Sequence, residues 1–72
     1  MNNKTENQIV SAMQNSKGRF FSLETKTGEI YNAQFSYDTP KTVVIYDRNR
    51  FLHRRLNKSS LARFKMGQVS VA

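Results

Sequence analysis

The sequence predicts a mainly β protein, a small closed barrel of five short strands preceded by one short α-helix. A chain of 72 residues has room for one domain, so residues 1–72 are treated as a single unit. Apolar residues make up 38% of the chain, with five Phe and three Tyr, which argues against disorder. Short alternating runs separated by Gly, Pro, Asn and Asp are typical of strands joined by tight turns.

A short helix is expected over residues 5–15. Thr5 and Gln8 have the spacing of a capping box, which satisfies the first free N–H groups of a helix. Gly18 suits the left-handed residue that ends one. Because so short a helix is unstable alone, we expect it to dock over one end of the barrel. Its apolar stripe for docking consists of Ile9, Ala12 and Met13.

The first two strands are expected to form a hairpin. The first strand is predicted over residues 19–25 and the second over residues 30–36, with a turn at Gly28, which supplies a positive φ. Residues 37–41 are predicted as a loop, because Pro40 cannot donate a hydrogen bond to a β-ladder.

Residues 42–46 give the strongest strand signal. They are rich in β-branched side chains and apolar on both faces, as a central strand would be. The rest of the chain is predicted as a turn over 47–50, a fourth strand over 51–56, a break over 57–60 with one 3₁₀ turn over 59–62, a fifth strand over 63–66 and a flexible tail over 67–72.

Five strands within residues 18–66, with one helical turn before the last, indicate a closed barrel. Closure would remove the strand edges that a small β protein otherwise leaves open. SH3-like, Sm-like and OB barrels all satisfy this pattern. An OB barrel usually has longer strands and more residues, so an SH3-like (Sm-like) barrel is favoured.

The charge of the chain is one-sided. Residues 1–47 carry five basic and five acidic side chains, whereas residues 48–72 carry seven basic side chains and no acidic one. The net charge of +7 therefore comes from the last third of the chain. Such a block attracts polyanions. A solvated basic surface that only aids solubility is the alternative.

The predicted fourth strand places part of this charge beside an aromatic ring. Phe51, His53 and Arg55 share one face of the strand. Leu52 and Leu56 share the other face with Arg54, which must therefore reach solvent or pair with an acidic residue such as Asp47. An exposed ring beside histidine and arginine can stack on a base and bind phosphate. Alternatively, Phe51 belongs to the core and the arginines are scattered.

A nucleic-acid-binding surface is therefore expected in the C-terminal third. Five of its seven basic residues are arginine, which grips phosphate through two donors and stacks on bases, as lysine cannot. Phe51 is assigned to stacking. The residues assigned to phosphate contact are Arg48, Arg50, His53, Arg55, Lys58, Arg63 and Lys65.

The residues do not suggest catalysis, a cofactor or a metal. The chain has one histidine and no cysteine, and no glycine-rich phosphate loop appears. Ser59 and Ser60 have no evident base, and Glu24 and Glu29 flank an exposed hairpin. We therefore expect no enzyme. The polar N-terminus and the lack of a long apolar run indicate a cytoplasmic protein rather than a secreted or membrane-bound one.

Several segments carry a family resemblance. Residues 18–22 (GRFFS), 43–47 (VVIYD), 53–57 (HRRLN) and the pair Ser60-Leu61 resemble small phage-encoded SH3-type barrel proteins, also described as WYL-like or Sm-like. The resemblance spans roughly residues 18–66 and implies an SH3-type fold and a phage origin, hence the cytoplasm of a bacterial host. The chain departs from the pattern at His53, Arg55 and Lys58, and it lacks the Trp-Tyr-Leu triplet.

A weaker resemblance is to the bacterial Sm-like RNA chaperone, which also has an N-terminal helix and five strands. Residues 28–38 look like its second strand and following turn. Asn57-Lys58-Ser59 falls near the place of its Tyr-Lys-His uridine-binding motif, but only the lysine is retained. Uridine binding is therefore not carried over, and a hexameric ring is an alternative.

The expected function is non-catalytic binding of RNA or DNA through the basic C-terminal face. A phage-encoded module that binds an acidic surface of a host protein, and so inhibits or redirects it, is the first alternative. A homo-oligomeric, Sm-like RNA-binding ring is the second.

Overall fold

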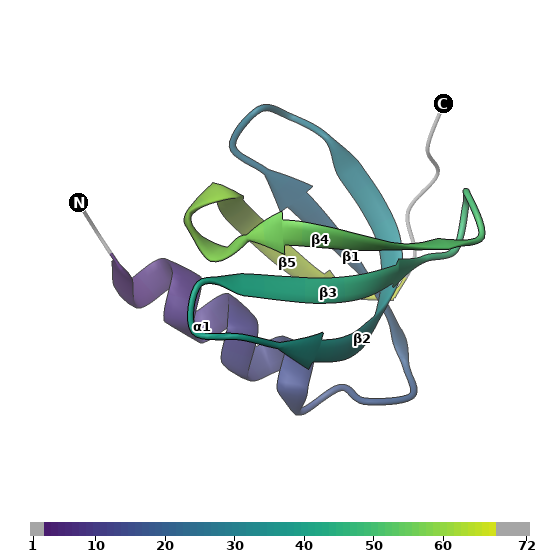
Figure 1. Cartoon of the computed structure of the whole chain (residues 1–72), viewed down its shortest axis with the longest axis horizontal. Helices are drawn as coiled ribbons and strands as arrows, with labels where there is room; N and C mark the ends of the chain where they lie inside the picture. The colour runs from purple at the N-terminus through teal and green to yellow at the C-terminus, as the bar shows by residue number, and fades with distance from the viewer. Residues whose placement is uncertain (1–2, 68–72) are drawn as a thin grey trace.

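The structure, a computed structural model, describes residues 3–67. One helix, α1 (Asn3–Gln14), precedes a single antiparallel sheet with the strand order β4-β3-β2-β1-β5 (Figure 1). This confirms the predicted mainly β fold with an N-terminal helix. The strands are β1 (Phe20–Thr25), β2 (Ile30–Asp38), β3 (Thr42–Asp47), β4 (Leu52–Asn57) and β5 (Leu61–Met66), with the 3₁₀ helix η1 (Lys58–Ser60) before β5.

The core lies between α1 and the inner face of the sheet. Met13 of α1 and Phe21 of β1 are fully buried, and the rings of Phe21 and Phe64 lie 5.0 Å apart. The helix packs against β5, β2 and η1, which confirms the expected docking. Other core residues without exposed surface are Leu23, Ala33, Val43, Ile45 and Leu61.

Several boundaries differ from the prediction. β2 continues to Asp38, because a bulge between Phe35 and Tyr37 lets Tyr37 pair with Val44. β4 begins at Leu52 rather than at Phe51, whose φ of 57° belongs to the turn. Gly18 (φ 79°) and Gly28 (φ 89°) have the positive φ predicted for them.

The second half also contains shifted elements. The 3₁₀ helix spans Lys58–Ser60 rather than 59–62, and β5 begins two residues early at Leu61, whose side chain is buried in the core. Of the predicted tail over 67–72, residues 68–72 lie outside the described part. No helix within residues 3–67 has the length and apolar character needed to cross a membrane.

The barrel is not closed by hydrogen bonds. β5 pairs with β1, while β4 pairs with β3, so β4 and β5 form the two ends of the sheet. The expectation that closure removes the strand edges is therefore wrong. The reason lies in η1, which turns the chain away from β4 and sends β5 across to β1. Both end strands keep one open edge.

Candidate nucleic-acid interface

The turn between β3 and β4 is organised by one buried carboxylate, that of Asp47. Its Oδ1 accepts hydrogen bonds from the backbone N–H groups of Asn49 (3.1 Å) and Arg50 (3.3 Å). Its Oδ2 accepts from Arg50 Nη1 (3.0 Å) and Arg54 Nε (2.8 Å). The predicted pairing of Arg54 with Asp47 is thus confirmed. Both guanidinium groups also lie over the ring of Tyr31.

These contacts keep the carboxylate charged. Burial raises the pKa of Asp47, but the hydrogen bonds from Arg54 and Arg50 outweigh burial and hold the pKa below its ordinary value of 3.8. The side chain of Asp47 has no exposed surface, whereas those of Arg50 and Arg54 are 49% and 34% exposed. The charge of Arg50, assigned to phosphate contact from the sequence, is therefore partly compensated by Asp47.

Phe51 lies in the same turn and is exposed. It has 79% of its surface open to solvent, so the alternative that placed it in the core is wrong. Its φ of 57° is left-handed, a conformation that costs a non-glycine residue roughly 1–2 kcal/mol. Its backbone N–H donates to the carbonyl oxygen of Asp47 at 2.8 Å. The turn therefore holds an aromatic ring in solvent on a strained but well-supported backbone.

The outer face of the sheet carries a row of side chains that crosses four strands. Phe20 of β1 opposes Gln34 of β2, Gln34 opposes Tyr46 of β3, and Tyr46 opposes His53 of β4. Directly opposed residues of antiparallel strands project from the same face. We call these four residues the outer row. The rings of Tyr46 and His53 meet edge to face, with centroids 5.4 Å apart.

Two arginines flank the outer row. Arg48 places its guanidinium 5.2 Å from the ring centroid of Phe20. Arg55 shares the outer face of β4 with His53 and lies opposite Val44 of β3. On the other side of Val44 lies Tyr37 of β2, which is half-exposed. The row and its two flanking arginines thus combine π faces and cations on one face of the sheet.

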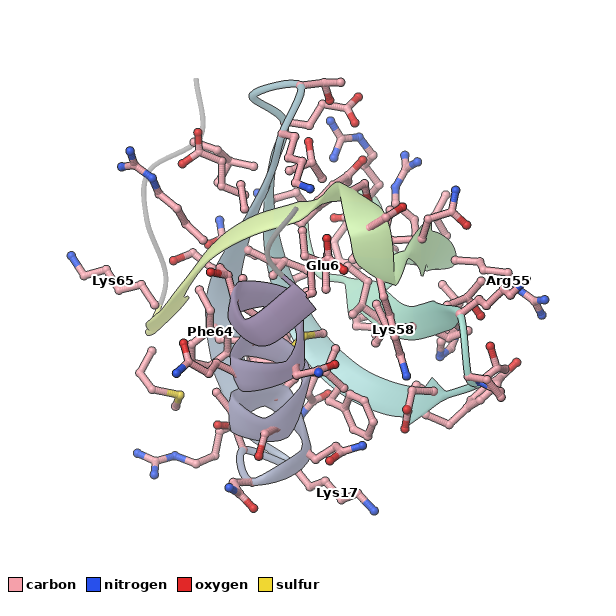
Figure 2. All side chains as sticks on the ribbon, turned by 90° about the vertical axis from the view of Figure 1, so that its left-hand side faces the viewer. Glu6, Lys17, Arg55, Lys58, Phe64 and Lys65 are labelled. Atoms are coloured by element: carbon pink, nitrogen blue, oxygen red, sulfur yellow. The ribbon has the colours of Figure 1, made fainter. Side chains whose placement is uncertain are left out.

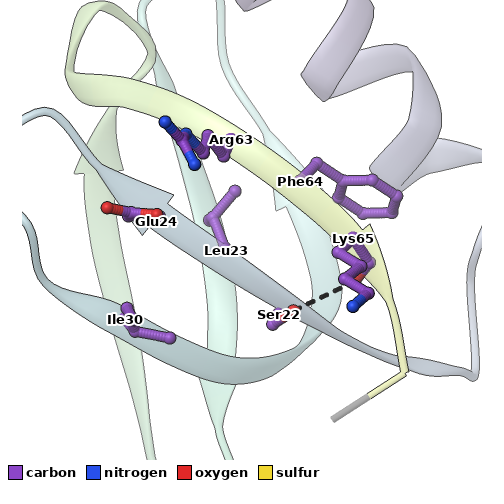
Figure 3. A pocket seen from close by; sticks show the side chains of 7 residues that line it. All are labelled: Ser22, Leu23, Glu24, Ile30, Arg63, Phe64 and Lys65. Carbon is purple, nitrogen blue, oxygen red and sulfur yellow. Dashed lines mark hydrogen bonds between the residues drawn. The ribbon is translucent and has the colours of Figure 1, made fainter. Parts of the chain in front are cut away.

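The remaining assigned residues lie elsewhere. Arg63 and Lys65 are on β5 at the far end of the sheet, and Figure 2 shows Lys65 and Arg55 projecting on opposite sides of the molecule. Arg63 and Lys65, together with Ser22, Glu24 and Ile30, line a hollow of about 340 Å³ (Figure 3). The Oγ of Ser22 donates to the carbonyl oxygen of Lys65 at 3.3 Å. The eight assigned residues therefore do not form one continuous patch.

Lys58 is committed to an internal contact. Its Nζ donates to Oδ2 of Asp38 at 2.8 Å, while Oδ1 of Asp38 accepts from Gln14 Nε2 at 3.0 Å. Hydrogen bonds from Lys58 and then Gln14 hold the pKa of Asp38 below its ordinary value of 3.8. The Lys58 side chain is only 19% exposed. This contact ties α1, β2 and η1 together.

Replacing Lys58 by methionine is expected to lower the free energy of unfolding by about 1 kcal/mol, because a charge-assisted hydrogen bond is lost at a partly buried site. Urea unfolding at neutral pH measures the change. Lys41→Met removes the same charge from an exposed loop lysine with no ion pair among the described residues, and it should change stability by less than about 0.5 kcal/mol. Equal losses in the two variants would show that the Asp38 contact contributes nothing.

Sequence reasoning missed Phe20, Gln34 and Tyr46. Strand alternation gives each residue one of two faces, but only the register between strands shows that these three lie in line with His53. A search restricted to the basic C-terminal third could not have found them.

The described residues contain no group of three or more His, Cys, Asp or Glu side chains that could hold a metal ion. Comparison of the chain with protein-family models, curated proteins and solved structures finds no match.

Proposed function

We propose that this protein binds nucleic acid, without catalysis, through the outer row and its flanking arginines. The observation that carries the proposal is the alignment of Phe20, Gln34, Tyr46 and His53 across four strands, with Arg48 and Arg55 beside them. Aromatic and imidazole rings on a sheet surface can stack on bases. Arginine binds phosphate through two donors.

Charge and composition favour nucleic acid over a protein partner on this face. Protein interfaces usually have an apolar centre and a polar rim. The outer row instead contains three rings and one side-chain amide, which can hydrogen-bond base edges, and arginines flank it. The net charge of +7 adds a long-range attraction for a polyanion. If the chain is phage-encoded, as its resemblance implies, binding would occur in the cytoplasm of the bacterial host.

The direct test is fluorescence anisotropy with labelled single-stranded RNA, single-stranded DNA and duplex DNA at about 50 and 200 mM salt. The double variant Arg48→Glu/Arg55→Glu is expected to weaken binding of the best ligand about 10- to 100-fold and to reduce the salt slope by about 1.5. Arg50 is left unchanged, because its reversal would place a second carboxylate beside the buried Asp47.

The matched control is Lys17→Glu/Lys41→Glu, which changes net charge equally at two residues that belong neither to the outer row nor to its flanking arginines. It is expected to weaken binding only about 3-fold or less. Thermal unfolding checks that both variants are folded. Equal losses in the two double variants would mean that the attraction is generic, and the proposed interface would be wrong.

A further inference from the structure

Phenylalanine is a conformationally unfavourable residue at position 51. The final residue of the β3–β4 turn has a left-handed backbone, which glycine and asparagine adopt with little or no strain. Phe51 is 79% exposed, and its ring makes no ring stacking or cation–π contact within residues 3–67. Packing within the chain therefore does not compensate for the strain of a phenylalanine there.

The backbone that carries the ring is nevertheless held in place. The carboxylate of Asp47 accepts hydrogen bonds from two backbone N–H groups of the turn, and the backbone carbonyl of Asp47 accepts one from the N–H of Phe51. Asp47 is itself fixed by Arg54. A ligand that stacks on Phe51 would meet a preorganised turn backbone and would lose little entropy in ordering the turn. Arg50, which precedes Phe51 in the turn, is 49% exposed but is paired with Asp47.

We infer that the ligand of this surface is a single-stranded nucleic acid, with Phe51 as a stacking contact that a duplex cannot use. This inference rests on the proposed function. In a duplex the faces of the bases are covered by their neighbours, so a ring in a turn and rings on a sheet reach only base edges and phosphates. In a single strand each base offers a π face to a ring.

The outer row supports the same ligand. Neighbouring strands lie about 4.8 Å apart, so Phe20 on β1 and Tyr46 on β3 are separated by roughly 10 Å across the sheet. Rings at that separation can each stack on a different, non-adjacent base of one extended strand. Arg48 beside Phe20 and Arg55 beyond His53 then lie where the flanking phosphates would pass.

The test compares Phe51→Gly with Phe51→Tyr in the full chain. The probes are labelled RNA and DNA single strands of about 12 nucleotides and mixed sequence, and the matching duplex DNA. The unchanged protein should bind a single strand more tightly than the duplex. Phe51→Gly should weaken single-strand binding about 5- to 100-fold while duplex affinity stays within about 2-fold, and Phe51→Tyr should retain binding. The RNA and DNA arms identify which single strand is preferred.

Thermal unfolding separates stacking from folding, because Phe51→Gly should leave the Tm unchanged or raise it by up to about 5 °C. This inference is overturned, and the proposed function left standing, if the unchanged protein binds the duplex more tightly than a single strand. The same holds if Phe51→Gly loses no affinity for the single strand, or loses affinity for single strand and duplex equally. If the unchanged protein binds no probe more tightly than Arg48→Glu/Arg55→Glu does, both are overturned.

Discussion

Replacement of Asp47 by alanine is expected to lower the free energy of unfolding by about 3 kcal/mol. The variant removes the acceptor of four hydrogen bonds, two from backbone N–H groups of the turn and two from guanidinium groups. The arginines are partly exposed and can be rehydrated, so the loss stays below that of a fully buried broken pair. A domain of this size has only about 3–5 kcal/mol to lose. Chemical unfolding followed by circular dichroism measures it.

Asp47→Asn is the matched control. It keeps an oxygen that can accept the N–H groups of Asn49 and Arg50, but it loses the charge that binds the arginines. Asp47→Asn is therefore expected to lower the free energy of unfolding by about half as much as Asp47→Ala. If alanine and asparagine destabilise the protein equally, the turn hydrogen bonds contribute nothing. If neither destabilises it, Asp47 does not organise the turn.

Acid provides an independent check on the same carboxylate. Because the pKa of Asp47 is lower in the folded protein, its charged form contributes stability above the ordinary value of 3.8. That contribution disappears as the pH falls from 3.8 through the lower folded pKa. Stability of the unchanged protein should therefore fall more steeply in this range than that of Asp47→Asn, whose side chain does not titrate.

Phe21→Ala is expected to cost about 3–5 kcal/mol, enough to unfold most of the protein. Phe21 has no exposed surface and packs on Phe64, so the change leaves a cavity between β1 and β5. Thermal unfolding and near-ultraviolet circular dichroism measure the loss. Phe21→Leu keeps most of the volume and should cost less than about 1.5 kcal/mol. A folded, cooperative Phe21→Ala variant would contradict the assigned core.

The local parts of the fold were predictable from the sequence. Strand alternation placed Arg54 on the inner face between two leucines, and this is why its pairing with Asp47 could be expected. Gly18 and Gly28 marked turns because their conformations suit glycine. Such features depend on residues that are neighbours in the chain.

The candidate site depends on longer-range relations. The outer row exists only because the registers of three strand pairs, β1–β2, β2–β3 and β3–β4, bring its four residues into line. No local sequence pattern fixes these registers. The Lys58–Asp38 contact joins residues 20 positions apart, so Lys58 looked in sequence like any other surface cation. The sequence predicts a strand that begins at Phe51, whereas the residue has a left-handed φ of 57° and belongs to the turn, a conformation that no strand pattern indicates.

The two open edges of the sheet have a consequence for how the protein behaves at high concentration. Neither β4 nor β5 contains an acidic residue, and besides Arg54, which pairs with Asp47, they carry Arg55, Arg63 and Lys65. An exposed edge is a template for aggregation, and positive charge along it is a common protection. This protection acts through repulsion, which salt screens over about 8 Å at physiological ionic strength. The protein should therefore aggregate more readily as the ionic strength rises.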